Sequence, residues 1–396
     1  MSKPELLSPV QDFVSLKAAI HGGANAIYFG IKGLNMRMGA KNFQLKDTSK
    51  VINECHQNKV KAYFTLNTII YDNEMKKISQ ILKKLKKEKI DSIIAWDFSV
   101  IEECKKLSLK VHLSTQASIS NYQSLKAITQ KFKNIKRVNL ARELSLGQIE
   151  NIIKNIKKQN LKVEIETFVH GAMCVSVSGR CFLSQEVFGK SANRGECIQP
   201  CRRKYLVKDI EEKHEFELGE DYVMSPKDLC TIQVIDKLKK ANINAFKIEG
   251  RNRSPEYVKT VTEAYREAID TSYSKELLNK LKTAYNRGFS TGFYLGKPIN
   301  QWAKEYGSKA TKKKIYIGKV INFYKKIKVA EILIESNNIK LKDNIMIQGP
   351  TTGVLNQTIM SIQKDHKTIK IAKKKDIVAI KVKDTVRQND KIFLFK

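Results

Sequence analysis

The sequence predicts an α/β fold: a TIM-like (β/α)8 barrel that carries a cysteine-rich insertion and is followed by a small all-β barrel domain. Short apolar, β-rich runs alternate about eight times with amphipathic helical patterns, which is typical of a parallel barrel. The interval between the last two runs is too long for one helix and its loops, and it holds most of the cysteines. After Trp302 apolar residues alternate with period two, which indicates strands. We expect a barrel domain at 1–305, with the insertion at about 171–235, and a β domain at 312–396.

The barrel strands are expected where short apolar runs lie between polar turns. Between most of these runs, as at 14–23 and 75–89, apolar residues recur at i, i+3, i+4 and i+7, which is the spacing of an amphipathic helix. The predicted barrel strands are 5–7, 26–29, 61–66, 92–96, 110–114, 137–141, 162–168 and 245–249.

The C-terminal part of the chain has a different pattern. Residues 305–314 are polar and predict a linker. Beyond them, alternate residues are apolar and polar turns separate the runs, as in a small all-β domain. The strands predicted there are 315–321, 328–335, 344–349, 358–363, 368–372, 377–382 and 391–396.

Polar residues that follow the predicted barrel strands are candidates for an active site. Parallel strands of a TIM barrel all end at the C-terminal face, where active sites gather, although a single polar residue there can equally serve as a loop or cap residue. His170 is either a base or donor near a cofactor, or the partner in a structural hydrogen bond. The predicted catalytic residues are Arg142, Glu143, His170, Glu249 and Arg251. The predicted substrate-binding residues are Asn67, Gln116, Arg180, Arg202, Arg203, Lys247 and Arg253.

The formal net charge of +33 and the pI near 9.7 indicate a polyanionic partner, for which RNA is the natural candidate. The basic residues are 61 lysines and 12 arginines, so biased residue usage is the alternative explanation. Half of the arginines lie between residues 180 and 253, around the cysteines, where the planar guanidinium fork suits anionic groups. The sequence shows neither an export signal nor an apolar run of membrane-spanning length, so we expect a cytoplasmic protein that does not contact membranes.

Four cysteines, Cys174, Cys181, Cys197 and Cys201, lie close together in the sequence, and Cys230 follows. Without an export signal, metal binding or redox chemistry is favoured over disulfides. Three residues separate the second pair, as in many zinc sites, but six separate the first pair. Wide and uneven spacing suits an iron–sulfur cluster, whose thiolates bind different corners of the cluster. Spacing alone leaves an iron–sulfur cluster, zinc, and inert or redox-active thiols open.

Several long motifs resemble those of one family. The segment ETFVHGAMCVSVSGRCFLS at 166–184 resembles the signature of the collagenase-like peptidases, peptidase family U32. The similarity continues in RGECIQPCRRKY, MSPKDLC, FKIEGRNRSPEYV and RGFSTGFY, and it includes ELLSP and GGANAIYFG near the start. The resemblance therefore spans nearly the whole chain.

This resemblance implies a TIM-like barrel with a [4Fe–4S] cluster and hydroxylation chemistry that does not require dioxygen. Cys174, Cys181, Cys197 and Cys201 would hold the cluster, with Cys230 as the rival for the fourth position. Among the branches of the family the chain looks most like the tRNA hydroxylation protein P branch. That branch implies tRNA as partner, 5-hydroxyuridine at the wobble position as product, and prephenate as the small-molecule hydroxyl donor. The C-terminal domain resembles the barrels of translation factors, which fits RNA binding.

Two other functions stay open from the sequence. The family name suggests a collagenase-like peptidase, but neither a serine-protease triad nor a His-Glu-x-x-His helix is visible among the six histidines. A non-catalytic RNA-binding iron–sulfur module is the other alternative, which a measured product on RNA would exclude. The sequence leaves the oligomeric state open.

Overall fold

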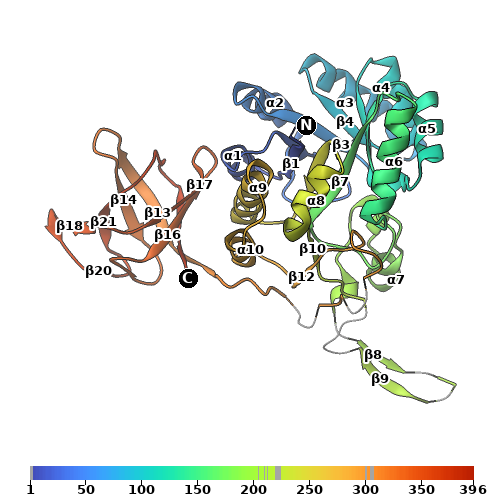
Figure 1. The fold of residues 1–396 in the computed structure, drawn as a ribbon. Helices are drawn as coiled ribbons and strands as arrows, with labels where there is room; N and C mark the ends of the chain where they lie inside the picture. Colours follow the sequence, from blue (N-terminus) through green and yellow to red (C-terminus); the bar gives the residue numbers. More distant parts are fainter. Residues whose placement is uncertain are drawn as a thin grey trace.

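Eight parallel strands close into a barrel in the computed structural model (Figure 1). Each strand pairs with the next one along the chain, and the last strand, β11, pairs with both β7 and β1, which closes the ring. The barrel strands are β1 (Glu5–Pro9), β2 (Ala26–Phe29), β3 (Lys61–Leu66), β4 (Ser92–Ala95), β5 (Val111–Leu113), β6 (Ile135–Asn139), β7 (Glu164–Gly171) and β11 (Ala245–Ile248). The predicted barrel is confirmed, and the ends of its strands agree with the sequence prediction within about three residues.

The structure describes residues 3–203, 205–208, 210–211, 213–218, 224–298, 301–303 and 307–396. Residues 305 and 306 of the predicted linker, and residues 204, 209, 212 and 219–223 of the predicted insertion, lie outside the described residues. Among the helices so described, none has the length and apolar character that a bilayer crossing requires.

Amphipathic helices surround the barrel. In α3 (Met75–Lys87) the residues Ile78, Ile81, Leu82 and Leu85 are buried on one face, which is the i, i+3, i+4, i+7 spacing of the sequence. The remaining helices of the barrel layer are α1 (Phe13–His21), α2 (Thr48–Gln57), α4 (Phe98–Lys106), α5 (Tyr122–Lys131), α6 (Leu146–Lys158), α8 (Ile235–Lys240), α9 (Pro255–Asp270) and α10 (Lys275–Lys282). Their apolar faces bury the main core against the strands.

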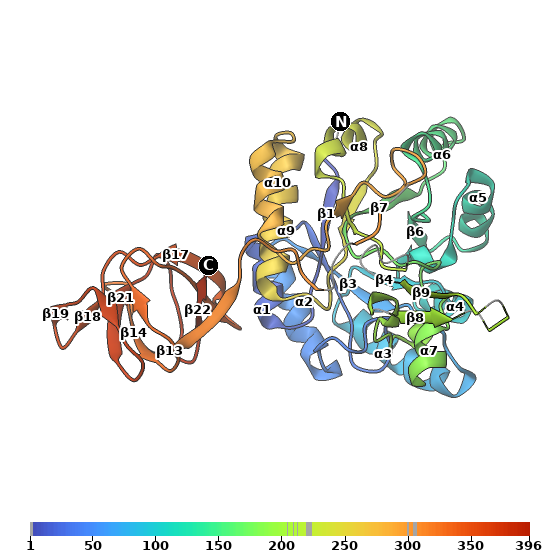
Figure 2. The same cartoon turned by 90° about the horizontal axis from the view of Figure 1, so that it is seen from below.

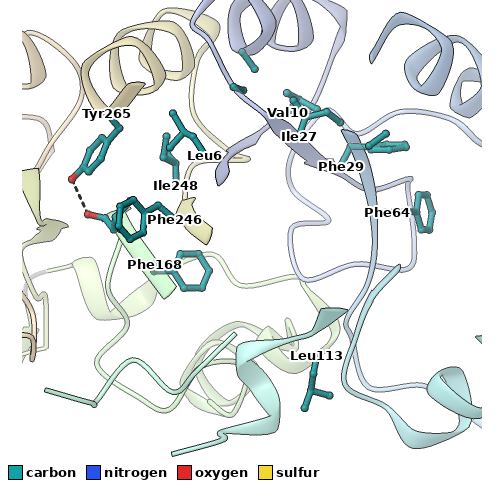
Figure 3. Packing of buried hydrophobic residues seen from close by; sticks show 14 of the residues in the cluster. Leu6, Val10, Ile27, Phe29, Phe64, Leu113, Phe168, Phe246, Ile248 and Tyr265 are labelled. Atoms are coloured by element: carbon teal, nitrogen blue, oxygen red, sulfur yellow. Dashed lines mark hydrogen bonds between the residues drawn. The ribbon is translucent and has the colours of Figure 1, made fainter. Parts of the chain in front are cut away.

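The main core lies between the strands and the helices, and Figure 3 shows part of it. Phe29 packs edge-on against both Phe43 and Phe64, at ring-centroid distances of 5.7 and 5.4 Å. Neighbouring strand residues point the other way, and a smaller cluster that includes Tyr28 and Tyr63 lies inside the ring of strands. The barrel interior is therefore packed rather than open.

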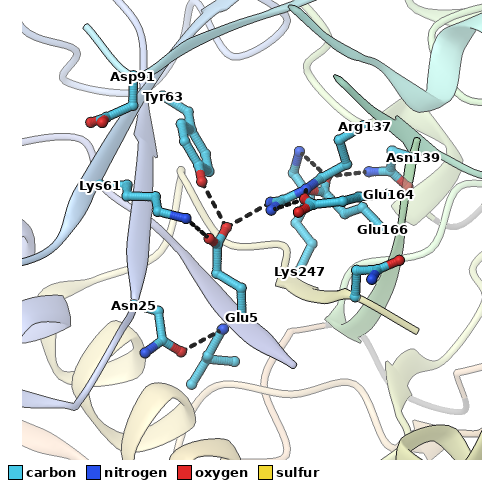
Figure 4. Close-up of polar contacts among 12 residues, drawn as sticks. Glu5, Asn25, Lys61, Tyr63, Asp91, Arg137, Asn139, Glu164, Glu166 and Lys247 are labelled. Atoms are coloured by element: carbon cyan, nitrogen blue, oxygen red, sulfur yellow. Dashed lines mark hydrogen bonds and ion pairs between the residues drawn. The ribbon is translucent and has the colours of Figure 1, made fainter. Parts of the chain in front are cut away.

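Charged residues occupy the N-terminal half of the barrel interior (Figure 4). Arg137 binds Glu5 at 2.6 Å and Glu164 at 2.5 Å, and all three of its side-chain nitrogens are engaged. Lys247 Nζ donates to Glu166 Oε1 at 2.9 Å within the same interior. Because each buried charge has a partner of opposite sign, this layer is self-contained.

The insertion between β7 and β11 contains α7 (Leu183–Phe188), the hairpin of β8 (Tyr205–Lys208) and β9 (Glu215–Leu218), and β10 (Asp228–Cys230). The hairpin projects away from the barrel in Figure 1, and in the view from below it lies in front of the barrel (Figure 2). Strand β10 runs antiparallel to β7, with Cys230 opposite His170, and pairs on its other side with β12 (Phe289–Ser290). The predicted cysteine-bearing insertion is thus confirmed, and its end is anchored to the barrel.

The C-terminal part is an all-β domain, as predicted. Its main sheet is antiparallel, in the order β17-β16-β22-β13-β14-β21-β18-β19, around a core of its own that includes Ile317, Ile332 and Ile347. The strands are β13 (Lys314–Tyr324), β14 (Val329–Ile334), β15 (Ile339–Lys340), β16 (Asn344–Gly349), β17 (Gly353–Thr358), β18 (Gln363–Lys364), β19 (Lys367–Thr368), β20 (Ile371–Ala372), β21 (Ile377–Lys381) and β22 (Lys391–Phe395).

One predicted strand of this domain, 358–363, is wrong, and another, 368–372, is broken into β19, which ends at Thr368, and β20, which begins at Ile371. The fourth long strand is β17 instead, which pairs with β16 from Asn344–Thr358 to Gly349–Gly353. Its sequence GVLNQT contains glycine, asparagine and glutamine, which favour strands poorly, so the pattern of the more apolar TIMSIQ misled the prediction. Pairing with β16 therefore determines where this strand lies, although the residues of β17 have a low intrinsic preference for strands.

The two domains pack together through α1 and α9 on one side and the β16–β17 hairpin on the other (Figure 1). Glu256 accepts hydrogen bonds from both Lys314 and Gln348 at 2.9 Å, and Lys259 Nζ donates to the carbonyl of Val354 at 2.6 Å. Val354 is buried as part of the barrel's apolar core. The β domain is therefore fixed to the outside of the barrel.

Candidate functional site

Three arginines surround one carboxylate at the C-terminal mouth of the barrel. Glu249 follows β11, and its Oε1 accepts from Arg37 Nε at 3.1 Å. Burial raises the pKa of Glu249, but the charges of Arg37, Arg142 and Arg251 outweigh this and hold that pKa below its usual value. The carboxylate is therefore ionised at neutral pH, and the three arginines and this glutamate carry a net charge of +2.

Arg251 forms the floor of this group and is 2% exposed. Its Nη1 donates to Thr65 Oγ1 at 2.6 Å, and its Nη2 donates to Asn35 Oδ1. A Cβ on Gly30, at the end of β2, would lie 2.7 Å from both Arg251 Nη1 and Thr65 Oγ1, so glycine is required for this close approach. Burial lowers the pKa of Arg251 to about 10, which leaves it charged at neutral pH.

Of these three arginines, Arg142 is the one with buried side-chain nitrogens that lack a hydrogen-bond partner among the described residues. Its Nη1 donates to the carbonyl of Ala172 at 3.0 Å, and its guanidinium lies 4.6 Å from the ring centroid of Phe168. Its Nε and Nη2 are buried and have no partner in the described part of the chain. Buried N–H groups are almost always paired in proteins, so two such donors in one side chain mark a place for an acceptor.

The insertion covers this mouth. Arg194 holds Glu74 through two hydrogen bonds of 2.6 and 2.7 Å and donates to the carbonyl of Ile69. A Cβ on Gly195, which has φ +90°, would collide with the carbonyl oxygen of Asn35 in the loop after β2. The same loop binds the insertion through Met38 N–H and the carbonyl of Gly195, at 3.0 Å. Glycine at 195 thus brings the insertion close to Arg37.

Cys174, Cys181, Cys197 and Cys201 gather in this insertion as free thiols. Burial raises the pKa of Cys197 and of Cys201, and negative charge on Cys174 and Cys181 would raise both further. Charge on Cys197 would also raise the pKa of Cys201, so Cys197 and Cys201 are each within electrostatic range of Cys174 and Cys181. Among the described residues no group of three or more His, Cys, Asp or Glu side chains converges closely enough to hold one metal ion.

Cys230 lies apart from these four. It is buried in the core beside Tyr265, and burial raises its pKa to about 11. The structure therefore places Cys201, rather than Cys230, next to the other three cysteines.

Two arginines follow Cys201 directly. Arg202 Nη1 donates to Ser225 Oγ at 2.8 Å and to the carbonyl of Pro226 at 3.0 Å, and its Nη2 donates to the carbonyl of Met173. The side chain of Arg203 is exposed and lies 4.4 Å from the ring centroid of Phe188. The neighbouring arginines thus have different surroundings, one inside the insertion and one at its surface.

His170 is buried, with its ring next to the rings of Tyr257, Tyr265 and Phe289. Burial lowers its pKa to about 4, so it is neutral at neutral pH. Its Nδ1 lies 3.4 Å from the hydroxyl of Tyr265. The structural hydrogen bond, one of the two readings left open above, is therefore present.

The other predicted site residues lie in three places. Asn67 and Gln116 are at the mouth, where Gln116 Nε2 donates to the carbonyl of Asn67 at 3.3 Å and Arg180 reaches the carbonyl of Gln116 at 3.5 Å. Lys247 is inside the barrel, where it is bound to Glu166 and lies 4.7 Å from the ring centroid of Tyr28. The guanidinium of Arg253 lies 3.6 Å from the ring centroid of Tyr285, and Glu143 is exposed without a partner among the described residues.

Sequence reasoning missed Arg37 and Asn35, both in the loop after β2. Arg37 binds Glu249, and the charges of Glu249 and Cys174 raise the pKa of Arg37 above its usual value. A signal was present, because Arg37 is the one arginine in the first 136 residues of a lysine-rich chain. Arg37 and Asn35 do not directly follow a predicted strand, so the position of the strands could not identify them.

The fold and this site define the class: a TIM-like barrel protein whose C-terminal mouth, rich in arginine, is covered by a cysteine-bearing insertion. The family model described as Peptidase family U32 matches residues 11–304. The chain belongs to peptidase family U32.

Relatives in this family have two kinds of names. A protein named collagenase from Porphyromonas gingivalis is 42% identical, covering 99% of this chain and 97% of the relative. An uncharacterized protease of Methanocaldococcus jannaschii is 43% identical, covering 99% and 98%. A protein named tRNA hydroxylation protein P1 from Bacillus subtilis is 34% identical, covering 91% of this chain and 87% of the relative. The family thus joins protease names and RNA-modification names.

Proposed function

We propose that this protein is a cytoplasmic tRNA-modifying iron–sulfur enzyme that replaces the hydrogen on carbon 5 of the wobble uridine by a hydroxyl group, without dioxygen. The observation that carries the proposal is the group of Arg37, Arg142, Arg251 and Glu249 at the barrel mouth, directly beside four gathered cysteines. A peptidase has no evident use for this combination. A redox centre that acts beside an anionic co-substrate requires both parts.

The four thiols fit a [4Fe–4S] cluster better than a single ion. A zinc ion with bonds of about 2.3 Å would hold its thiolates roughly 4 Å apart, and no such convergence is present among the described residues. A cubane binds each thiolate on a different iron, so its ligands stay farther apart while remaining neighbours. Cys174, Cys181, Cys197 and Cys201 would hold it, and when bound it would supply Lewis-acid or one-electron chemistry. The buried, unpaired Nε of Arg202 beside Cys201 is a further donor suited to such an anionic group.

The arginine group is suited to a small organic anion that supplies the hydroxyl oxygen, for which prephenate is our candidate. Replacing the hydrogen on carbon 5 by hydroxide releases one proton and two electrons, so the reaction also requires an electron acceptor. The free Nε and Nη2 of Arg142 form one side of a guanidinium, which can bind a carboxylate through two parallel hydrogen bonds. Arg251 is held by Thr65 and Asn35, so its charge is fixed before a ligand arrives. Glu249 orients Arg37 and remains available as an acceptor toward the uracil ring.

Single-stranded RNA is the substrate class that this arrangement can use. A base in an anticodon loop leaves its stack at low cost, whereas a base in a duplex does not. The net charge of +33 provides a sequence-independent attraction for the phosphates, and the β domain adds a second surface fixed to the barrel. The relative named tRNA hydroxylation protein P1 supports the proposal, since its similarity covers 91% of this chain.

A peptidase is the second candidate, favoured by one observation besides the names of relatives. Cys230 and His170 lie opposite each other on β10 and β7, and Cys230 lines a cavity of about 340 Å³. A cysteine nucleophile must be a thiolate, however, and burial raises the pKa of Cys230 to about 11. The pKa of His170, about 4, makes it a weak base. This pair is therefore poorly suited to peptide hydrolysis.

Nucleoside mass spectrometry of tRNA from cells with and without the gene tests the proposal. We expect the nucleosides derived from 5-hydroxyuridine to disappear in the deletion strain and to return with the wild-type gene but not with C197A. A full complement of these nucleosides in a deletion strain without a second copy would contradict it. Purified protein that binds tRNA without forming product would favour the non-catalytic module, and cleavage of gelatin that is lost in C230A would favour the peptidase.

A further inference from the structure

Arg202 joins three segments of the insertion around the cysteines. It follows Cys201 in the chain, its Nη2 donates to the carbonyl of Met173, which precedes Cys174, and its Nη1 binds Ser225 and Pro226. One guanidinium thus connects the loops that carry the first and last cysteines of the group. Its position is fixed by protein contacts and does not depend on solvent.

The remaining nitrogen of Arg202 has no protein partner. Its Nε is buried, and among the described residues of the insertion it is the one buried side-chain nitrogen or oxygen without a hydrogen bond. A buried donor left unpaired destabilises the fold, so proteins rarely keep one unless another group accepts its hydrogen bond. Four charged or ionisable groups act on this guanidinium: Arg287, Asp228, and the thiols of Cys201 and Cys174. Arg287 and Asp228 bind each other at 2.6 Å, and the two thiols belong to the cysteine group.

Arg203 provides the contrast. It adjoins Arg202 and carries the same charge, but it is exposed and lies against the ring of Phe188. Water and salt screen its charge, whereas the charge of Arg202 acts through the protein. If the four cysteines hold an anionic centre, the two arginines should differ in their effect on it.

We propose that Arg202 is a positioning residue for the iron–sulfur centre, which donates its Nε–H to a sulfur of that centre and raises its reduction potential. This inference rests on the cluster in the proposed function. One-electron reduction adds one negative charge to the cluster and its four thiolates. A fixed positive charge and a hydrogen bond to sulfur both stabilise the more negative, reduced form, so they favour reduction.

The experiment compares wild type, R202Q, R202K and R203Q after anaerobic purification. Iron and sulfide per chain are measured first, and then the midpoint potential is measured by a dithionite titration followed by electron paramagnetic resonance. We expect R203Q to match wild type. R202Q loses both charge and donor, so its reduction equilibrium constant should fall at least tenfold, which is about 59 mV for one electron. R202K keeps the charge but loses the Nε–H, so its potential should lie between those of wild type and R202Q.

The outcomes separate this inference from the proposed function. Wild-type protein without iron would overturn the cluster, and the role of Arg202 with it. A wild-type cluster whose potential is unchanged in R202Q, or shifts equally in R202Q and R203Q, would overturn only the role of Arg202. If R202Q does not retain iron, R202K decides: a lowered potential supports the proposal, and a wild-type potential contradicts it.

Discussion

Buried charged side chains have different partners at the two ends of the barrel. At the N-terminal end, Arg137 has every side-chain nitrogen bound to a carboxylate, and Lys247 is bound to Glu166 (Figure 4). At the C-terminal mouth, three arginines share the single carboxylate of Glu249, and two nitrogens of Arg142 have no partner in the described part of the chain. At the N-terminal end each buried charge has a partner of opposite charge, although Asn139 Oδ1 and His112 Nδ1 are buried there without a hydrogen bond. At the mouth, nitrogens of a charged guanidinium are themselves without a partner.

Burial of a charged side chain therefore does not by itself identify a functional site. Arg137 is 3% exposed and Arg251 is 2% exposed, so exposure does not separate them. What separates the two ends is the balance between donors and acceptors. Where each buried charge is met by another, the arrangement serves the fold, and where donors exceed acceptors, a missing partner is expected.

The largest effect should come from the cysteines beside the mouth. If the proposed cluster is present, C174A, C181A, C197A and C201A should each lose most of the iron and the brown colour of anaerobically prepared protein, because a [4Fe–4S] cluster needs four thiolates. C230A should keep both, since Cys230 lies in the core away from the other four. Iron and sulfide per chain, with visible absorption, provide the measurement. Full iron content in C201A together with loss in C230A would reverse our choice of the fourth ligand.

At the opposite end, R137M should destabilise the fold without affecting the mouth. Removing the guanidinium leaves the buried carboxylates of Glu5 and Glu166 with one cationic partner each, Lys61 and Lys247. We expect this partial loss of compensation to cost about 3 kcal/mol in the free energy of unfolding. R266Q is the matched control, because Arg266 pairs with Asp270 at the surface and its loss should cost less than about 1 kcal/mol. Urea unfolding measures both. Equal losses of unfolding free energy in the two variants would show that the ion pairs inside the barrel stabilise the fold no more than a surface ion pair does.

The sequence predicted the barrel and the place of the insertion because both depend on patterns that repeat over many residues. Its strand-exit rule also found Arg142, Glu249 and Arg251, since parallel strands must bring these positions to one face. The rule could not show that Lys247 turns inward to Glu166, because inward and upward positions alternate residue by residue at the end of a strand. Arg37 belongs to a loop whose path depends on contacts with the distant Gly195, which no local pattern records.

The pH dependence of stability should carry the signature of His170. The folded protein holds its imidazole neutral with a pKa of about 4, whereas the unfolded chain has the ordinary value of about 6.5. Between these values the unfolded state binds more protons, so His170 lowers stability by roughly 3 kcal/mol as the pH is lowered from 6.5 to 4. Burial also lowers the pKa of His112 and of His21, so these two histidines add to the measured fall. H170F keeps an aromatic ring in place and should remove only the share of His170. H366Q, at an exposed position in the β domain, is the control and should leave the profile of wild type, as measured by urea unfolding at several pH values.

The smallest effect is expected at Glu143. Its comparison with Glu249 tests which of the two carboxylates belongs to the site at the barrel mouth. Glu143 and Glu249 both follow barrel strands, and sequence reasoning treats them alike. In the structure Glu249 is bound by Arg37 and within the field of two further arginines, whereas Glu143 is exposed. E249Q keeps the shape but removes the charge that orients Arg37, so formation of 5-hydroxyuridine in purified tRNA should fall about a hundredfold. E143Q should change it less than about threefold. A large loss in E143Q would place that carboxylate on the bound RNA and extend the site beyond the arginine group, because no contact within the described protein would account for it.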